Sequence, residues 1–356
     1  MRDYFLSEFT DKSLSEIIQT LNIRTEDAAF NCKHKDTAAS FTRHRVFSFR
    51  VLLVFLMRNL QKSLQREIAC FTEAMESEGG SIPEVSKAAF CKARRKLNPS
   101  AFEELCQIVC DKFYETADYS RWHGLRVLAA DGSTAELPNS NEIKQAYGVF
   151  KTRSDGKEIC MGRMLTLYDT LNHITLHGAL GTMPSSETSM LWKALPELNL
   201  RSNDVLVFDR YYAAHLLMFY LARRGAHFCF RMKKDWWKVI EQFYNSGEQS
   251  GLITLTLPAK DKQAAAEPGI TQAHIQVRLA RIELESGETE ILLTSFTNTE
   301  AFSVADLKEL YGLRWPIEDS YKSFKHKVCV ENFSGKSRRS VLQDFYVKLF
   351  IMNLPQ

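Results

Sequence analysis

The stretch VLVFDRYYAAHLLMFYLARRGAHFCF, residues 205–230, decides the fold class of this chain. It predicts a buried strand at Val205–Phe208, an apolar helical segment from Tyr211 to Leu221 and a second strand at His227–Phe230. Three earlier apolar runs also have the length of strands: Leu125–Ala130, Met164–Tyr168 and His173–His177. Three strands followed by strand, helix and strand predict an α/β protein with a mixed sheet.

The segments before and after these strands also show patterns that predict secondary structure. Residues 1–120 are predicted to be helical, with helix-starting capping boxes at Ser13–Glu16 and Ser100–Glu103. Alternating strand-like stretches between residues 250 and 296 predict a β-rich insertion at about 234–290. Helix returns at Ser303–Asp306 with a kink at Pro316. The chain therefore divides into a helical region, 1–120, and an α/β region, 121–356.

The composition excludes several classes of protein. With 45% hydrophobic and 25% charged residues in 356, the chain is neither disordered nor fibrous. Its longest strongly apolar run, residues 51–57, is too short to cross a bilayer, and the N-terminus lacks the pattern of a signal peptide. Its eight cysteines include no CxxC, which argues against a zinc ribbon or a disulfide scaffold. A cytoplasmic protein with no membrane partner is expected.

Two aspartates directly follow predicted strands, Asp131 after residues 127–130 and Asp209 after residues 205–208. Open α/β sheets place their sites at the carboxyl ends of strands, so both carboxylates are candidates for a site. Each also has a structural alternative. Asp131-Gly132 is typical of a tight turn, and Asp209 is a plausible helix N-cap with a solvent-exposed ion pair to Arg210.

A third carboxylate lies in the stretch YGLRWPIEDSYKSFK, residues 311–325. At about 100° per residue, one helical face carries the residues Tyr311, Arg314, Glu318, Lys322 and Lys325. Such a face suits a metal-binding carboxylate flanked by cations that grip phosphates, or else a solvent-exposed helix with ion pairs. Three carboxylates on separate elements can bind two Mg²⁺ ions, an arrangement that fits phosphodiester cleavage and transfer.

The residues resemble the DDE transposases of bacterial insertion sequences, in the insertion-sequence family four branch. That branch is marked by Tyr, Arg, Glu and Lys at the intervals of Tyr311, Arg314, Glu318 and Lys325. The resemblance extends over roughly residues 85–350. It implies a ribonuclease-H-like core in which three residues bind Mg²⁺, or Mn²⁺ as a substitute: Asp131, Asp209 and Glu318. It also implies phosphate contacts by Tyr311, Arg314, Lys322 and Lys325, and assistance near the cut by Arg210.

The implied reaction is metal-dependent hydrolysis at the ends of a transposable element, followed by attack of the freed 3′ hydroxyls on target DNA. The implied partner is double-stranded DNA, both terminal inverted repeats and target, bound by a homodimer in the bacterial cytoplasm at the nucleoid. Some relatives cut through a DNA hairpin and use a Trp at about the position of Glu290. The hairpin step therefore stays open.

The positive charge is clustered, although the net charge is only +3. Residues 86–96 hold five basic side chains and no acid, among them Lys92, Arg94 and Arg95, and a second cluster spans 322–339. The first cluster predicts either a DNA-reading helix of the N-terminal region or a basic helix that merely faces solvent.

Two other functions compete with transposition. The apolar positions of the last helix, from about Val341, need a partner, and relatives commonly continue for further helices. This pattern predicts a truncated C-terminal helix, and with it an inactive remnant that only binds DNA. The other alternative is a nuclease with the same metal site but no strand transfer.

Overall fold

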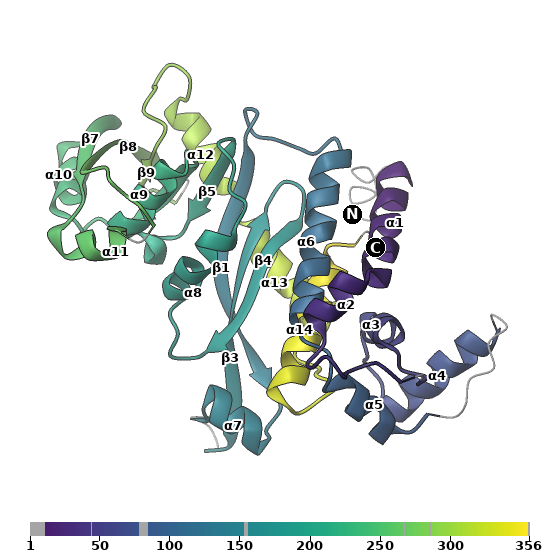
Figure 1. Ribbon diagram of the computed structural model, residues 1–356. Helices are drawn as coiled ribbons and strands as arrows, with labels where there is room; N and C mark the ends of the chain where they lie inside the picture. Colours follow the sequence, from purple (N-terminus) through teal and green to yellow (C-terminus); the bar gives the residue numbers. More distant parts are fainter. Residues whose placement is uncertain are drawn as a thin grey trace.

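The computed structural model describes residues 11–354 except 44, 78–84, 153–155, 267 and 285 (Figure 1). The predicted helical region forms six helices: α1 Asp11–Glu26, α2 Ala28–His34, α3 Phe49–Met57, α4 Leu64–Ser77, α5 Lys87–Arg94 and α6 Ser100–Thr116. The predicted start of a helix at Ser100 is confirmed, but its capping box does not form, because the N-cap residue is Pro99, whose side chain has no hydrogen-bonding group. The helix α1 begins at Asp11, two residues before the capping box predicted at Ser13. The Ser100 hydroxyl forms a hydrogen bond with His34 Nδ1 (2.9 Å).

A nine-stranded mixed sheet forms the centre of the α/β region. Its strands are β1 Arg126–Leu137, β2 Phe150–Lys151, β3 Glu158–Asp169, β4 Ile174–Thr182, β5 Asp204–Phe208, β6 His227–Met232, β7 Ser250–Thr256, β8 His274–Glu283 and β9 Thr289–Thr294. The order is β2-β3-β1-β5-β6-β9-β8-β7, with β4 on β3. The strands β1, β3 and β4 form an antiparallel meander, and β5 and β6 run parallel to β1. The mixed α/β sheet predicted from the sequence is therefore confirmed.

The strands β7–β9 continue the same sheet. The strand β9 pairs antiparallel with β6, from Cys229 opposite Thr294 to Met232 opposite Ile291, and β8 and β7 follow outward. Three short helical segments accompany them: α10 Lys238–Ser246, η3 Ala259–Asp261 and α11 Lys262–Ala266. The β-rich segment predicted from sequence thus widens the central sheet.

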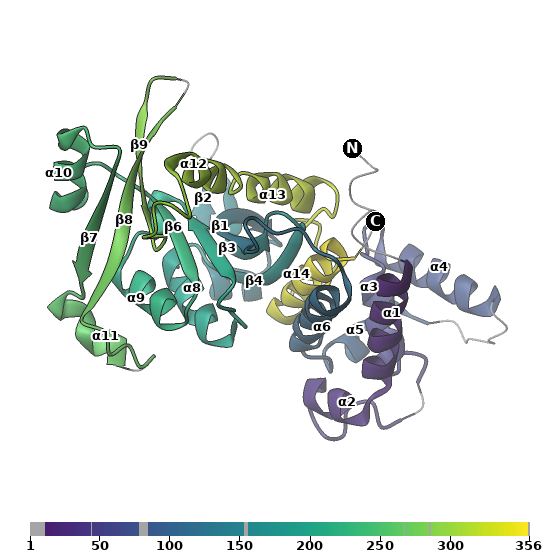
Figure 2. The same ribbon diagram turned by 90° about the horizontal axis from the view of Figure 1, so that it is seen from above.

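Helices cover both faces of the sheet (Figure 2). One face carries α12 Val304–Gly312 and α13 Pro316–His326, and the other carries α8 Glu187–Ala194 and α9 His215–Arg223. Alternating strand residues divide between the faces: Val205 and Val207 pack with α12, whereas Leu206 and Phe208 join the cluster of α8 and α9. The remaining short elements are α7 Asn141–Tyr147, η1 Leu195–Glu197 and η2 Arg210–Tyr212. The predicted capping box at Ser303–Asp306 and the break at Pro316 are confirmed.

The last helix, α14 Arg338–Met352, packs between the helical region and the sheet. Its Val347 and Phe350 belong to the core of the N-terminal helices, whereas Phe345 and Leu349 pack with α13 and β1. Of the apolar positions predicted to need a partner, Val341, Phe345 and Leu349 are buried within the described chain, whereas Leu342 and Met352 are partly exposed. Among the described residues, the structure contains no helix with the length and apolar character that a membrane crossing requires.

Candidate functional site

Asp131 lies in β1, and Asp209 directly follows β5, the neighbouring parallel strand. The last register pair between β1 and β5 joins Ala129 to Val207, and each aspartate comes two residues later. Asp131 is not at a strand end as predicted, since β1 runs on to Leu137 and Asp131 pairs with Thr166 of β3. The turn alternative is therefore excluded. The N-cap part of the alternative for Asp209 is confirmed, because its carboxylate accepts a hydrogen bond from the backbone N–H of Arg210 (2.6 Å) at the start of η2.

Arg314 joins Asp131 to the third predicted carboxylate. Its guanidinium donates to Glu318 Oε1 (Nη2, 2.9 Å) and lies 3.7 Å from Asp131 Oδ2. The residue itself is buried, at 6% exposure, in the break between α12 and α13. A buried guanidinium shared by two carboxylates holds acids from the sheet and from α13 at one place.

Tyr321, one turn beyond Glu318, fixes α13 on the sheet. Its hydroxyl donates to the backbone carbonyl of Asp131 (2.6 Å) and accepts from the hydroxyl of Thr166 (3.0 Å). Sequence reasoning missed this residue, and the only signal for it was an aromatic position three residues after Glu318. The bond ties the helix that carries Glu318 to the backbone that carries Asp131.

The electrostatics of this cluster are unusual. Burial raises the pKa of Asp131 to about 6, the charges of Glu187 and Glu318 add to the rise, and the Gly132 N–H and Arg314 oppose it. Burial also raises the pKa of Tyr311 to about 12. In the described part of the chain, the Tyr311 hydroxyl and the Arg314 Nε are buried without a hydrogen-bond partner. Buried polar groups without partners often mark functional sites.

The donors of this cluster fit a hard divalent cation, although they are not assembled around one. Carboxylate oxygens are the ligands that Mg²⁺ and Mn²⁺ prefer in proteins. Within the described ranges, no three acidic, histidine or cysteine side chains lie close enough together to hold a metal ion as they stand. Two of the predicted ligands, Asp131 and Glu318, instead share Arg314.

The predicted phosphate-binding residues occupy different environments. Lys322 is exposed and pairs with Asp319 (2.8 Å), and Lys325 is half-buried in the last turn of α13. The guanidinium of Arg210 lies over the ring of the exposed Tyr211, 5.3 Å from its centroid. Tyr311 and Arg314 are buried, so the predicted helical face divides into a buried half and an exposed half.

Of the basic residues predicted on α5, Lys92 and Arg95 are exposed but Arg94 is buried, at 5% exposure. Arg94 donates to Gln343 Oε1 (2.7 Å), Ser334 Oγ (2.7 Å), the Ser340 carbonyl (2.9 Å) and Asp344 Oδ1 (2.6 Å). Its side chain therefore joins α5 to α14, and the expectation that it contacts DNA does not agree with this placement. A run of basic residues in the sequence predicts a positively charged helix, but it does not show which of the basic side chains is buried.

A groove lies beside this buried cluster and brings the two basic clusters of the sequence together. It has a volume of about 290 Å³ and lies between α5 and the segment 334–343. Its lining includes the cations Arg95, Lys336 and Arg339 and the hydroxyls of Ser334 and Ser337. Arg339 is partly neutralised by Asp36 (2.7 Å), and Lys336 is exposed.

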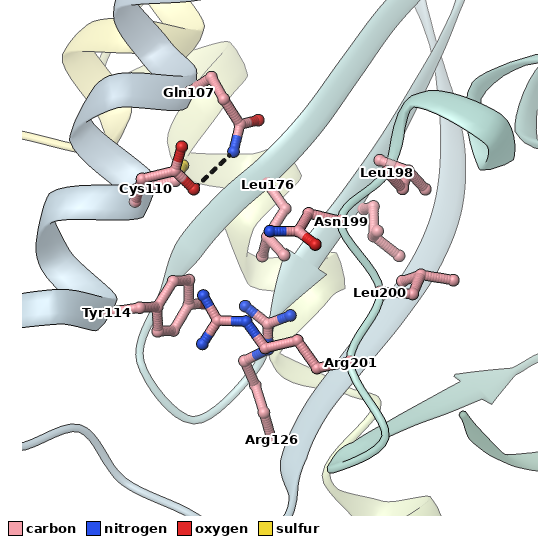
Figure 3. Close-up of a pocket in the computed structure, with 11 residues that line it drawn as sticks. Gln107, Cys110, Tyr114, Arg126, Leu176, Leu198, Asn199, Leu200 and Arg201 are labelled. Carbon is pink, nitrogen blue, oxygen red and sulfur yellow. Dashed lines mark hydrogen bonds between the residues drawn. The ribbon is translucent and has the colours of Figure 1, made fainter. Parts of the chain in front are cut away.

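A second cavity is structural (Figure 3). It measures about 20 Å³, room for about one water. Arg126 and Arg201 lie beside the ring of Tyr114, and Arg126 forms a buried ion pair with Asp204 (2.7 Å). Arg126 begins β1, whereas Asp131 lies five residues further along the strand, so this cavity is separate from the carboxylate cluster.

Comparison with known proteins is consistent with this arrangement. The transposase DDE domain model matches residues 122–354. Transposase InsG of Escherichia coli K12, for insertion sequence element IS4, is 24% identical over 280 residues, which are 77% of this chain and 61% of InsG. InsZ of the same strain is 24% identical over 145 residues, 40% of this chain and 48% of InsZ. The chain thus spans about half to three fifths of the length of these relatives.

Two solved structures resemble the chain at lower similarity. A piggyBac transposase synaptic complex with hairpin DNA covers 97% of this chain and 72% of its own, with 12% identity and a TM-score of 0.45. A pre-cleavage Mos1 transpososome covers 81% and 82%, with 9% identity and a TM-score of 0.22. The family model matches well over half of the residues. On that match, the chain belongs to the transposase DDE domain family.

Proposed function

We propose that this protein is a metal-dependent DNA transposase that cuts the ends of an insertion sequence and joins them to target DNA. The observation that carries the proposal is the cluster in which Arg314 links Asp131 of the sheet to Glu318 of α13. Asp209 directly follows β5, which pairs in parallel with β1, the strand of Asp131. Membership of the transposase DDE domain family supports the same conclusion.

The three carboxylates of Asp131, Asp209 and Glu318 are the proposed metal ligands. A bound Mg²⁺ pair, or Mn²⁺ in its place, supplies an activated water or hydroxyl and stabilises the leaving oxygen. Arg314 holds two of these acids together, and its guanidinium would also be able to bind a phosphate oxygen. The exposed Lys322 and the half-buried Lys325 and Arg210 are proposed to bind the DNA backbone.

DNA binding is proposed to extend into the groove beside α5. Positive charge is concentrated at this groove, although the net charge of the chain is only +3. The cations are Lys92 and Arg95 on the α5 side and Lys336 and Arg339 on the other side. Phosphate contacts there would release counterions and make binding strongly dependent on salt. The partners we propose are terminal inverted repeats and target DNA, bound by a homodimer in the bacterial cytoplasm.

The test is cleavage of DNA that carries the element's ends, with Mg²⁺ or Mn²⁺. We expect Asp131→Ala, Asp209→Ala and Glu318→Ala each to abolish cleavage while DNA binding survives, and Asp235→Ala, at an exposed acid, to cut normally. Normal cleavage by any of the first three contradicts the proposal. Cleavage without transfer to a target plasmid would make the protein a nuclease.

A further inference from the structure

A fourth carboxylate, Glu187, lies against the backbone next to Asp131. A Cβ built on Gly132 would come within 2.1 Å of the Cδ atom of Glu187, far inside any real contact. Gly132 lies in regular strand, and its φ is outside the left-handed region, so the backbone conformation does not demand glycine. A side chain at position 132 would therefore displace the Glu187 carboxyl group from its place.

Two other elements hold this carboxyl group in place. Arg163 of β3 donates to Glu187 Oε1 (2.8 Å), and the buried hydroxyl of Tyr212 in η2 donates to Glu187 Oε2 (3.3 Å). Glu187 is the first residue of α8, after the N-cap Ser186, where the helix dipole favours a negative charge. Its side chain is 25% exposed. Both oxygens are thus oriented by contacts, and rotation of the carboxyl group would break them.

These contacts connect β1, which carries Asp131, to the η2 turn that Asp209 caps. Gly132 directly follows Asp131 in β1, and Tyr212 ends the η2 turn that Asp209 opens. We propose that Glu187 is a positioning residue, whose carboxylate, held by Arg163 and Tyr212 against Gly132, sets the spacing between Asp131 and Asp209. This inference rests on the proposed function, because it assigns the two aspartates to one metal site.

The spacing between Asp131 and Asp209 matters because two carboxylates from separate elements can bind the same metal ion only if the fold holds them at the distance that the ion requires. Residues that orient ligands typically change metal affinity or activity by about 10- to 100-fold when they are replaced. Glu187 does not need to touch the metal to act in this way. A residue that merely stabilised the fold would lower the melting temperature and leave the metal concentration at half-maximal cleavage unchanged.

The experiment combines Glu187→Ala, Glu187→Gln, Gly132→Ala and the double variant Gly132→Ala/Glu187→Ala. Three quantities are measured: the Mn²⁺ concentration at half-maximal cleavage, Mn²⁺ binding to the DNA-free protein by electron paramagnetic resonance, and the melting temperature. Glu197→Gln, at an exposed acid just beyond α8, is the matched control. Glu187→Gln keeps the shape of the side chain and therefore remains informative if Glu187→Ala does not fold.

We expect Glu187→Ala and Gly132→Ala each to weaken Mn²⁺ binding and raise the half-maximal concentration by roughly tenfold or more. Glu187→Gln should give a smaller shift, because the amide cannot pair with Arg163 as a charge. In the double variant the clash is gone, so the melting temperature lost in Gly132→Ala should return while Mn²⁺ binding stays as weak as in Glu187→Ala. Such non-additivity is the signature of direct contact.

The inference is overturned if the Glu187 variants bind and use Mn²⁺ within twofold of the unaltered protein while Asp131→Ala is inactive. It is also overturned if the effects of Gly132→Ala and Glu187→Ala on the melting temperature simply add. Normal cleavage by Asp131→Ala would refute the proposed function itself, so the two failures are distinguishable.

Discussion

Replacing Asp344 by Ala tests whether the cation of Arg94 is structural. The Arg94–Asp344 pair is almost fully buried, with 6% and 8% of the two side chains exposed. The variant removes the only carboxylate that the described structure places on Arg94, and it leaves the guanidinium with neutral acceptors from Gln343, Ser334 and Ser340.

The expected cost follows from burial. Breaking a buried ion pair by removing one partner typically costs about 3–5 kcal/mol, because an uncompensated charge stays in a poorly hydrated place. For a protein of this size, that loss corresponds to a fall in melting temperature of about 4–7 °C. The double variant Arg94→Met/Asp344→Leu removes both charges and should recover most of the loss.

The assay is thermal unfolding followed by circular dichroism, together with DNA binding at several salt concentrations. Lys92→Met, at an exposed cation on the same helix, is the matched control, and it should weaken DNA binding without lowering the melting temperature. The reasoning is refuted if Asp344→Ala unfolds at the unaltered temperature. It is equally refuted if the double variant loses DNA binding and its salt dependence in the way that Lys92→Met does.

Three further predictions concern single side chains. Tyr311→Phe removes a buried hydroxyl that has no partner in the described structure, so chemical denaturation should show unchanged or up to about 1 kcal/mol greater stability, whereas DNA cleavage should slow if the hydroxyl contacts phosphate. Burial raises the pKa of Glu104, but contacts from Lys33, Arg24 and His34 outweigh it and lower that pKa to about 2. The ionised Glu104 therefore stabilises the fold fully above its unfolded pKa near 4.5, and this stabilisation is lost as the pH falls towards 2. Glu104→Gln should reduce the dependence of the unfolding free energy on pH in this acid range by up to about 3 kcal/mol. Gly178→Ala would put a methyl group 2.3 Å from Leu349 Cδ1, and should cost about 1–3 kcal/mol in calorimetry; no loss would mean that α14 shifts freely on β4.

Sequence periodicity predicted the elements of this fold well. The run 205–230 forms β5, η2, α9 and β6, since strand-length apolar runs and helical spacing report burial directly. The signature around Glu318 correctly predicted a helix broken at Pro316. These features depend on residues close together in the chain, where a pattern carries most of the information.

Features that depend on distant contacts could not be predicted. Asp131 was expected at a strand end because the apolar run stops at Ala130, but pairing with β3 carries β1 on to Leu137. Arg94 was grouped with its basic neighbours, because nothing local shows that Asp344 lies opposite it. Glu187 gave no signal, since its role depends on a glycine 55 positions earlier. Local patterns thus located the acids but not the contacts that orient them.

The position of α14 has a consequence for how the protein is made. The core of the N-terminal helices includes Val347 and Phe350, which are synthesised more than 200 residues after α6. At a typical rate of about 5–20 residues per second, the ribosome reaches them roughly 10–50 s later. The helical region therefore lacks part of its own interior during that time. Its folding should finish together with that of the sheet, and a ribosome-bound chain stalled before residue 340 should leave α6 open to protease.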